Sequence, residues 1–415
     1  MKPCMAAGGK ALLGSVLVVC SLVAAAWTPA AAADSARRIT DSPAEADPVT
    51  RTGFEHFYNL EYDAAVADFE KADKAHSDDP FAVNHLLNAV LFRELYRVGA
   101  LDTSLYSSNS FVAKKKFDLD PKVKDRVAEL MARAFTLSEQ RLKADPKDVQ
   151  ALYTRGITRG MRATYLALVE KAWFAALRSA IAARHDHEKV LEMEPDFADA
   201  KTIVGVHNYV AGSLPWAIKV AVSVVGLTGS KQKGLQYLYA AAEGGGETAP
   251  DAKITLALFL RREQRFDDAL KVIRTLTAAY PRNSLFAIEE GNILNAGGHG
   301  MDAIAVFRAV LEKGKKGYYK DPHLELAVFT LGEALRGQKL YKEAAEAYEM
   351  VRSFPHRDPE LLQKADLAAG QMHDQQQERP QALADYHAVL AADRSSPEAE
   401  QARRFLRQPY RAPSP

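Results

Sequence analysis

The chain has few cysteines, and those it has lie at one end. Of its 415 residues only Cys4 and Cys20 are cysteines, and both fall within the first 33 positions. We expect that segment to be removed, which leaves no disulfide bond and no thiolate metal site in the mature protein. Hydrophobic residues make up 47% of the chain, which is enough for a continuous core.

Long hydrophobic runs are also scarce. The clearest one occupies residues 11–27, after two lysines, and Thr28-Pro29 and four alanines follow it before Asp34. A positive start, an apolar centre and small residues at a cleavage point are the parts of a secretory signal peptide. Residues 1–33 are therefore predicted to be a signal peptide, and the mature protein is predicted to be periplasmic or secreted.

Two alternatives keep the chain at a membrane. The apolar run of about 17 residues is at the lower limit for a membrane span, so an uncleaved anchor stays open. Cys20 raises a lipoprotein interpretation, although Val19 is bulkier than the residue that bacterial lipoproteins usually carry before the lipidated cysteine.

Neither sign of charge is in excess. The chain has 54 lysines and arginines against 53 acidic residues, and its formal charge of +1 becomes −1 once the two lysines of the signal are lost. Nucleic-acid binding requires a basic face, so this balance argues against nucleic acid as a partner. It also argues against a strongly anionic lipid surface as the main partner.

What the sequence does contain is a repeated helical pattern. A small residue is followed four positions later by a bulky one and seven positions later by an apolar one. The four sets are Ala269, Ile273 and Leu276; Ala303, Phe307 and Val310; Ala344, Tyr348 and Val351; Ala382, Tyr386 and Val389. In the last three sets a glycine (Gly291, Gly332 or Gly370) lies twelve positions before the alanine.

This pattern resembles the tetratricopeptide repeat, a helix–turn–helix unit of about 34 residues with small residues where its two helices cross. Tyr341 is a further marker position. The resemblance implies an all-α, right-handed superhelical solenoid of helix pairs. In that family the inner helices line a groove that receives peptides or protein surfaces.

The pattern also divides the chain. We predict a flexible leader at residues 34–48, a divergent repeat array at 49–243, and regular units at 248–393 after the Gly244-Gly245-Gly246 break. A capping helix is expected at 396–408, and a disordered tail at 409–415. The divergent array has a long loop at 102–120, which is either functional or a family-specific insertion, and an apolar segment at 210–229, which is either buried or a docking surface.

A narrower resemblance concerns the middle of the chain. The stretch 58–96, Leu214-Pro215 through Gly229, and Gly234-Leu235-Gln236-Tyr237-Leu238 are similar to the tetratricopeptide-repeat-39 and inclusion-body-clearance family of eukaryotic proteins. That family has a similar leading repeat, a proline-broken apolar helix and a Gly-Leu motif. The export signal departs from the family, so its cellular role is not carried over.

No motif in the sequence indicates catalysis. His185 and His187 are two positions apart, which turns them about 200° from each other on a helix, whereas zinc-binding helices space two histidines four apart. His187 also follows Ala183 by four, so we expect it to be packed or hydrogen-bonded. Gly297-Gly298-His299-Gly300 is expected to be a turn and not a phosphate loop. We predict no enzyme, no cofactor and no metal.

Binding residues can be placed on the repeat template. The predicted groove positions are Phe54, Phe57, Tyr58, Tyr153, Tyr209, Arg262, Asn292, Asn295, Phe329 and Arg336. The alternative for the aromatic ones is core packing between repeats. A separate set, Arg155, Arg159 and Arg162, falls on one helix face and could clamp an anion on a partner or pair with acidic residues of the chain itself.

These observations favour an exported, non-catalytic adaptor or scaffold that binds a peptide or partner domain in its groove. One alternative is an envelope scaffold tethered through the N-terminus or through the 210–229 segment. Another is a small-molecule-binding or enzymatic helical protein that uses an apolar pocket around Trp216.

Overall fold

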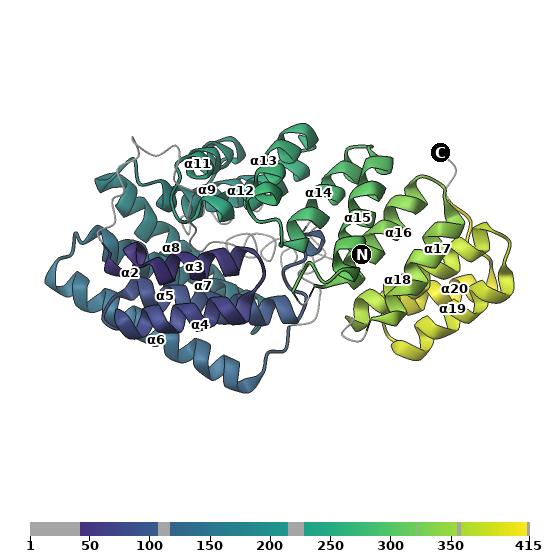
Figure 1. The fold of residues 1–415 in the computed structure, drawn as a ribbon, viewed down its shortest axis with the longest axis horizontal. Helices are drawn as coiled ribbons and strands as arrows, with labels where there is room; N and C mark the ends of the chain where they lie inside the picture. Colours follow the sequence, from purple (N-terminus) through teal and green to yellow (C-terminus); the bar gives the residue numbers. More distant parts are fainter. Residues whose placement is uncertain (1–41, 107–116, 215–227, 321, 355–357, 413–415) are drawn as a thin grey trace, which may run out of the picture. The chain divides into compact units, whose positions relative to one another are not determined.

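The computed structural model describes residues 42–106, 117–214, 228–320, 322–354 and 358–412 (Figure 1). Every regular element in these ranges is a helix, as the all-α prediction requires. The chain forms two compact units, Met1–Glu263 and Gln264–Pro415, called unit 1 and unit 2 below. The predicted signal peptide, residues 107–116 of the long loop and residues 215–227 of the apolar segment lie outside the described residues.

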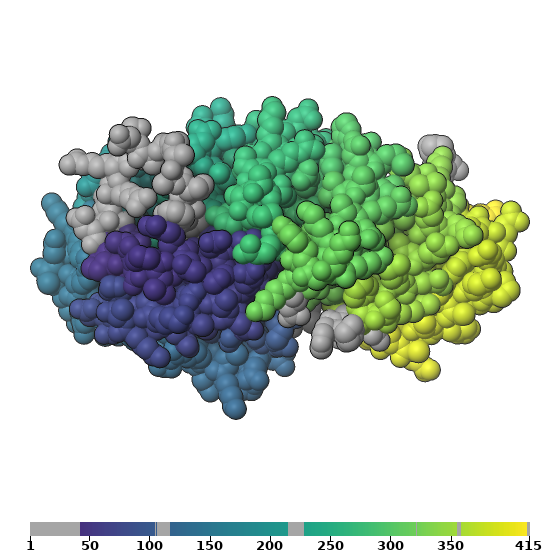
Figure 2. Space-filling view, in the orientation of Figure 1, coloured from purple at the N-terminus to yellow at the C-terminus, as the bar shows by residue number. Residues whose placement is uncertain are grey.

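Unit 1 contains ten α-helices and one short 3-10 helix within its described part. They are α2 (Pro43–Ala46), α3 (Pro48–Tyr58), α4 (Tyr62–Ala75), α5 (Pro80–Arg97), η2 (Thr103–Tyr106), α6 (Pro121–Ala144), α7 (Val149–Leu168), α8 (Trp173–Met193), α9 (Ala198–Ser213), α11 (Lys231–Glu243) and α12 (Ala249–Arg262). α3 and α4 contact each other, and their atoms form one continuous purple surface in Figure 2.

The described part of unit 2 is a succession of three helix pairs, with one helix before them and one after them. Its elements are α13 (Phe266–Ala279), α14 (Ser284–Ala296), α15 (Gly300–Lys315), α16 (Leu324–Gly337), α17 (Tyr341–Met350), η4 (Val351–Ser353), α18 (Pro359–Gln375), α19 (Arg379–Ala392) and α20 (Pro397–Arg407). Each α-helix contacts the next one in chain order. The last, α20, buries Ala399, Ala402 and Phe405 against Tyr386 and Val389, so the predicted capping helix is confirmed.

Several helices begin at an Asp-Pro or Ser-Pro dipeptide. Asp47, Asp79, Asp120 and Asp358 each accept a hydrogen bond from a backbone N–H in the first helical turn, and proline follows at the first helical position. The missing N–H of proline costs nothing there, because the first N–H groups of a helix have no partner within it. These dipeptides therefore determine where the four helices begin.

In four of the repeats a glycine packs directly against an aromatic ring. A Cβ added to Gly53 would lie 2.8 Å from Phe69, and on Gly291 it would lie 2.4 Å from Phe307. The same holds for Gly332 with Tyr348 and for Gly370 with Tyr386, at 2.6 Å each. The alanines that define the repeat are fully buried where the helices cross. The twelve-residue spacing in the sequence therefore reports a direct contact between two helices.

The turn inside each pair also repeats. Five positions before the alanine, the backbone has a positive φ, at Leu60, Gln264, Gly298, Lys339 and Gln377. The glycine-rich motif at 297–300 is thus the same turn as in the other units, as predicted. Four of the five units use a side-chain-bearing residue in this left-handed conformation, which is strained for any residue with a Cβ.

Three of the predicted boundaries need correction. Residues 42–46 of the leader are ordered, because Ser42 Oγ donates to Asp79 Oδ2 at 2.6 Å and Ala44 is buried. The Gly244-Gly245-Gly246 break is a turn between α11 and α12, which contact each other, so the division between the units falls at Glu263 instead. Residues 409–412 of the tail are described, and Tyr410 packs against the core of unit 2.

Among the described residues, no helix combines the length and the hydropathy that crossing a bilayer requires.

Candidate functional site

The inner surface of unit 2 is built by α14, α16 and α18, which contact one another in that order. Contacts among α15, α17 and α19 are fewer. The helix pairs therefore converge on the α14, α16 and α18 side, which is the concave side of such an array.

Four predicted binding residues lie on two of these inner helices and are half-buried: Asn292 and Asn295 on α14, and Phe329 and Arg336 on α16. The Phe329 ring lies 5.7 Å from the Tyr348 ring, and Asn292 Nδ2 lies 3.5 Å from Glu289 Oε2. The amide of Asn295 makes no hydrogen bond with any residue that the structure describes, and it can both donate to and accept from a bound backbone.

The five predicted aromatic groove residues of unit 1 are core residues instead. Phe54, Phe57, Tyr58, Tyr153 and Tyr209 are all at least 95% buried. Tyr153 packs 4.8 Å from Phe197, and Tyr209 stacks 3.7 Å from Phe259. This is the core-packing alternative, and it removes these side chains from any open groove. Arg262, also in unit 1, is half-buried at the end of α12.

The predicted anion clamp is largely neutralised within unit 1. Arg155 and Arg159 both contact Asp186, which is fully buried, and Arg155 Nη1 also lies 2.9 Å from Glu139 Oε1. Arg162 is exposed and pairs with no residue in the described part of the chain. Arg155 and Arg159 therefore pair with acidic residues of the chain itself, whereas anion binding stays a prediction for Arg162.

Arg159 and Arg162 line a surface hollow of about 420 Å³ with Glu139 and Arg178. Its walls come from α6, α7 and α8. The hollow is rich in positive charge, but Glu139 at its edge partly neutralises it.

His187 behaves as the repeat register predicts. It is fully buried, its Nδ1 lies 2.8 Å from the Ala183 carbonyl oxygen, and burial lowers its pKa. A Cβ on Gly156 would lie 2.3 Å from its ring, so His187 fills the place that an aromatic ring fills in other units. His185 is exposed on the other side of α8, which rules out a joint metal site.

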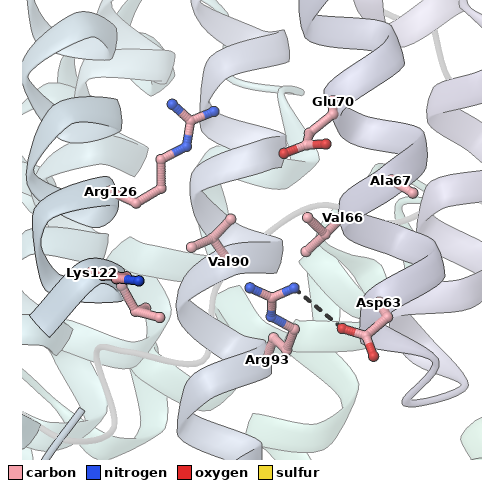
Figure 3. Close-up of a pocket in the computed structure, with 9 residues that line it drawn as sticks. Asp63, Val66, Ala67, Glu70, Val90, Arg93, Lys122 and Arg126 are labelled. Atoms are coloured by element: carbon pink, nitrogen blue, oxygen red, sulfur yellow. Dashed lines mark hydrogen bonds and ion pairs between the residues drawn. The ribbon is translucent and has the colours of Figure 1, made fainter. Parts of the chain in front are cut away.

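A second hollow lies between α4, α5 and α6 (Figure 3). Its volume is about 430 Å³, and Val66 and Val90 form its apolar floor. Asp63 and Glu70 line one side, and Arg93, Lys122 and Arg126 line the other, with Arg93 Nη1 3.2 Å from Asp63 Oδ1. Its residues are spread over three helices, so no local motif in the sequence marks it.

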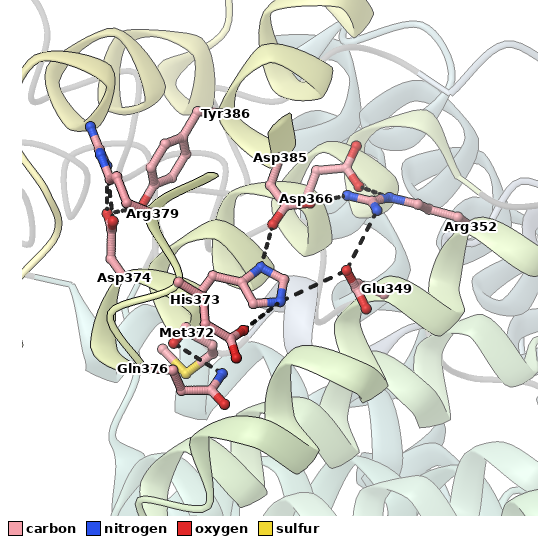
Figure 4. Close-up of polar contacts among 11 residues, drawn as sticks. Glu349, Arg352, Asp366, Met372, His373, Asp374, Gln376, Arg379, Asp385 and Tyr386 are labelled. Atoms are coloured by element: carbon pink, nitrogen blue, oxygen red, sulfur yellow. Dashed lines mark hydrogen bonds and ion pairs between the residues drawn. The ribbon is translucent and has the colours of Figure 1, made fainter. Parts of the chain in front are cut away.

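One polar cluster of unit 2 was not predicted from the sequence (Figure 4). His373 Nδ1 lies 2.7 Å from Asp385 Oδ2, and Arg352 bridges Asp385 and Asp366 at 2.6 and 2.7 Å. These contacts tie η4, α18 and α19 together. One signal was available: His373 and Asp385 are twelve positions apart, as the glycine and alanine of each repeat are.

Glu349, His373 and Asp385 are the only described residues whose ligand atoms lie close enough to hold a metal ion, within 4.8 Å of one another. Both oxygens of Asp385 are already engaged, one by the Arg352 guanidinium and one by the His373 ring. A cation there would compete with a fixed positive charge, so the set fits an ion-pair network better than a metal centre.

A model of the tetratricopeptide repeat family matches residues 254–318 and, overlapping them, residues 296–358. No curated protein sequence matches the chain. The structure is similar to a chain of the Cut9–Hcn1 assembly of the APC/C, with 14% identity, a TM-score of 0.49, and coverage of 90% of this chain and 58% of that one. This chain thus spans little more than half of that relative.

Yeast Tom70 also matches, with 14% identity, a TM-score of 0.41 and coverage of 88% of both chains. The human IFIT1 dimer with m7Gppp-AAAA matches at 13% identity, a TM-score of 0.43 and 89% coverage of both. The narrower resemblance to the tetratricopeptide-repeat-39 family is not confirmed. The repeat match shows tetratricopeptide repeats in residues 254–358, and the glycine–aromatic contacts of Gly291 and Gly332 lie within that stretch.

Proposed function

We propose that this protein is a non-catalytic adaptor that binds a peptide or a partner domain along the inner helices of unit 2. The observation that supports this most directly is the row of half-buried Asn292, Asn295, Phe329 and Arg336 on α14 and α16. Amides and a guanidinium can bond an extended backbone, and a half-buried aromatic ring offers apolar contact area.

Capture of the partner tests the proposal. The full chain is crosslinked in its native compartment and recovered, and the bound proteins are identified by mass spectrometry. A variant with Asn292→Ala, Asn295→Ala and Phe329→Ala should lose a discrete set of partners. The matched control is Lys342→Ala with Glu346→Ala on the outer helix α17, where both side chains are exposed and unpaired among the described residues.

Two results would remove the proposal. One is the same set of proteins with both variants, which would place binding elsewhere. The other is no enriched protein in any capture. Helicity of each variant, measured by circular dichroism, shows that a loss of binding is not a loss of folding.

We also propose that the protein is exported and cleaved before Asp34. The support is the charge, apolar run and small residues of positions 1–33. The intact mass of the mature protein decides this: a chain that starts at Asp34 supports cleavage. A chain that retains residues 1–33, or one that carries two acyl groups on Cys20, supports the tethered scaffold instead.

A further inference from the structure

The tail after α20 folds back onto unit 2. The backbone becomes extended at Gln408, and Tyr410 then meets the C-terminal ends of α16 and α18. Its ring lies 5.2 Å from the Phe405 ring, edge to face. Residues 409–412 form no helix or strand, so Tyr410 is held by side-chain contacts and not by secondary structure.

Both backbone groups of Tyr410 are recognised. Its N–H donates to Asp374 Oδ2 at 2.7 Å, and its carbonyl oxygen accepts from Gln375 Nε2 at 3.2 Å. Side chains that bond both the N–H and the C=O of one residue select an extended backbone, because helices and turns use those groups internally.

The tyrosine side chain is recognised as well. Arg336 Nη2 donates to the Tyr410 hydroxyl at 3.2 Å, and the guanidinium lies 5.9 Å from the ring centre. Arg336 is one of the predicted groove residues on α16. We call Arg336, Asp374, Gln375 and Phe405 the Tyr410 seat.

The seat is rigidly built. The Asp374 side chain is 99% buried, and it also accepts from Arg379 Nη1 at 2.9 Å and from the Tyr386 hydroxyl at 2.8 Å. The Asp374, Arg379 and Tyr386 contacts are visible in Figure 4. Arg379 donates to the carbonyl oxygens of Phe405 and Leu406, so the same network that orients Asp374 also ends α20.

We propose that the Tyr410 seat is a binding site for an extended, tyrosine-bearing peptide segment, and that the chain's own tail fills it as an internal competitor. The inference deepens the adaptor function proposed above, because the seat lies on two of the same inner helices. A partner that presents such a segment must displace the tail. A short tether gives the tail an effective concentration of about 1 mM, so the tail is a strong competitor.

The test uses the full chain and a fluorescent synthetic peptide of residues 406–415. The Tyr410→Ala chain, with its seat vacated, should bind the peptide at least about tenfold more tightly than the wild-type chain, whose tail competes at the effective concentration given above. Adding Arg336→Ala to that variant should abolish the gain. Arg411→Ala is the matched control, because Arg411 is exposed on the tail and should leave peptide binding at the wild-type level.

A second measurement does not alter the tail. Amide hydrogen exchange at Tyr410 should be slow in the wild-type chain and become fast in Arg336→Ala and Gln375→Ala. Equal peptide binding by wild type and Tyr410→Ala, or fast exchange at Tyr410 in wild type, would overturn the inference. Neither result depends on a cellular partner, so the capture experiment can succeed or fail independently.

Discussion

Tyr348 packs so closely against Gly332 of the preceding helix that a Cβ on the glycine would lie 2.6 Å from ring atom Cε1. The ring is fully buried and has no room to withdraw. We therefore expect Gly332→Ala to lower the free energy of unfolding by about 1–3 kcal/mol, the usual cost of overpacking a core. Equilibrium unfolding in urea measures the change.

Gly337 provides the control on the same helix. A Cβ there would meet nothing within 4 Å, and the residue is exposed. Alanine favours a helix over glycine, so Gly337→Ala should raise stability by up to about 1 kcal/mol. A similar loss in both variants would contradict the glycine–aromatic packing as the cause.

Because these turns are strained, we expect a glycine in place of a residue with a Cβ to stabilise the protein. Gln377 has a φ of 64°, and the left-handed conformation is costly for residues with a Cβ. Gln377→Gly should raise the free energy of unfolding by about 1 kcal/mol, whereas Gly298→Ala should lower it by a similar amount. Thermal unfolding of both variants checks the opposite signs, and a shift in the same direction would refute the turn assignment.

Asp186 should be among the most sensitive polar positions. It is fully buried between Arg155 and Arg159, so its removal leaves two arginines without their shared anion. Asp186→Ala should lower the free energy of unfolding by about 3–5 kcal/mol. Arg162→Ala, which removes an exposed arginine from the same helix face, should change it by less than about 0.5 kcal/mol. Urea unfolding of the two variants measures both changes. Equal losses of stability in Asp186→Ala and Arg162→Ala would contradict this account.

The His373 cluster should make unit 2 sensitive to pH. The hydrogen bond to Asp385 raises the pKa of His373, and the charges of Asp385, Glu349 and Glu378 act in the same direction, while burial opposes them. Arg352, which also contacts Asp366, binds the other carboxylate oxygen of Asp385. A raised pKa in the folded state means that the stabilisation is complete below the unfolded value of about 6.5 and is lost as pH rises through the folded value.

His373→Gln should remove that dependence. The free energy of unfolding of the wild-type chain, measured in steps from pH 5.5 to pH 9, should fall on the alkaline side by more than that of the variant. Parallel curves for the two proteins would show that His373 does not carry the effect.

Local patterns made much of the fold predictable. The spacing of Gly370, Ala382 and Tyr386 depends on one helix crossing its neighbour, so the contact is encoded within a few turns of chain. Whether the Tyr153 side chain faces the core or the groove was not predictable, because its burial depends on Phe197 from another helix pair. The pairing of Arg155 with Asp186 joins two helices in the same way.

The tail shows a second limit. Its composition, rich in proline and small residues, is typical of disorder, and Tyr410 alone does not signal a binding site. Its partners Arg336 and Asp374 lie far back in the chain, on helices whose ends meet only after the repeats have stacked. Long-range contacts of this kind depend on the assembled structure.

Helix α5 has a consequence for the order in which the chain can fold. Sixteen of its 18 residues are buried, and it contacts α2, α4, α6 and α7. The chain is synthesised from its N-terminus, so α5 is made early. The helices that pack against α5 are complete only when synthesis has reached Leu168, the end of α7. During that interval its apolar surface is open to water and to other chains, so α5 is the segment of unit 1 that a chaperone would need to shield.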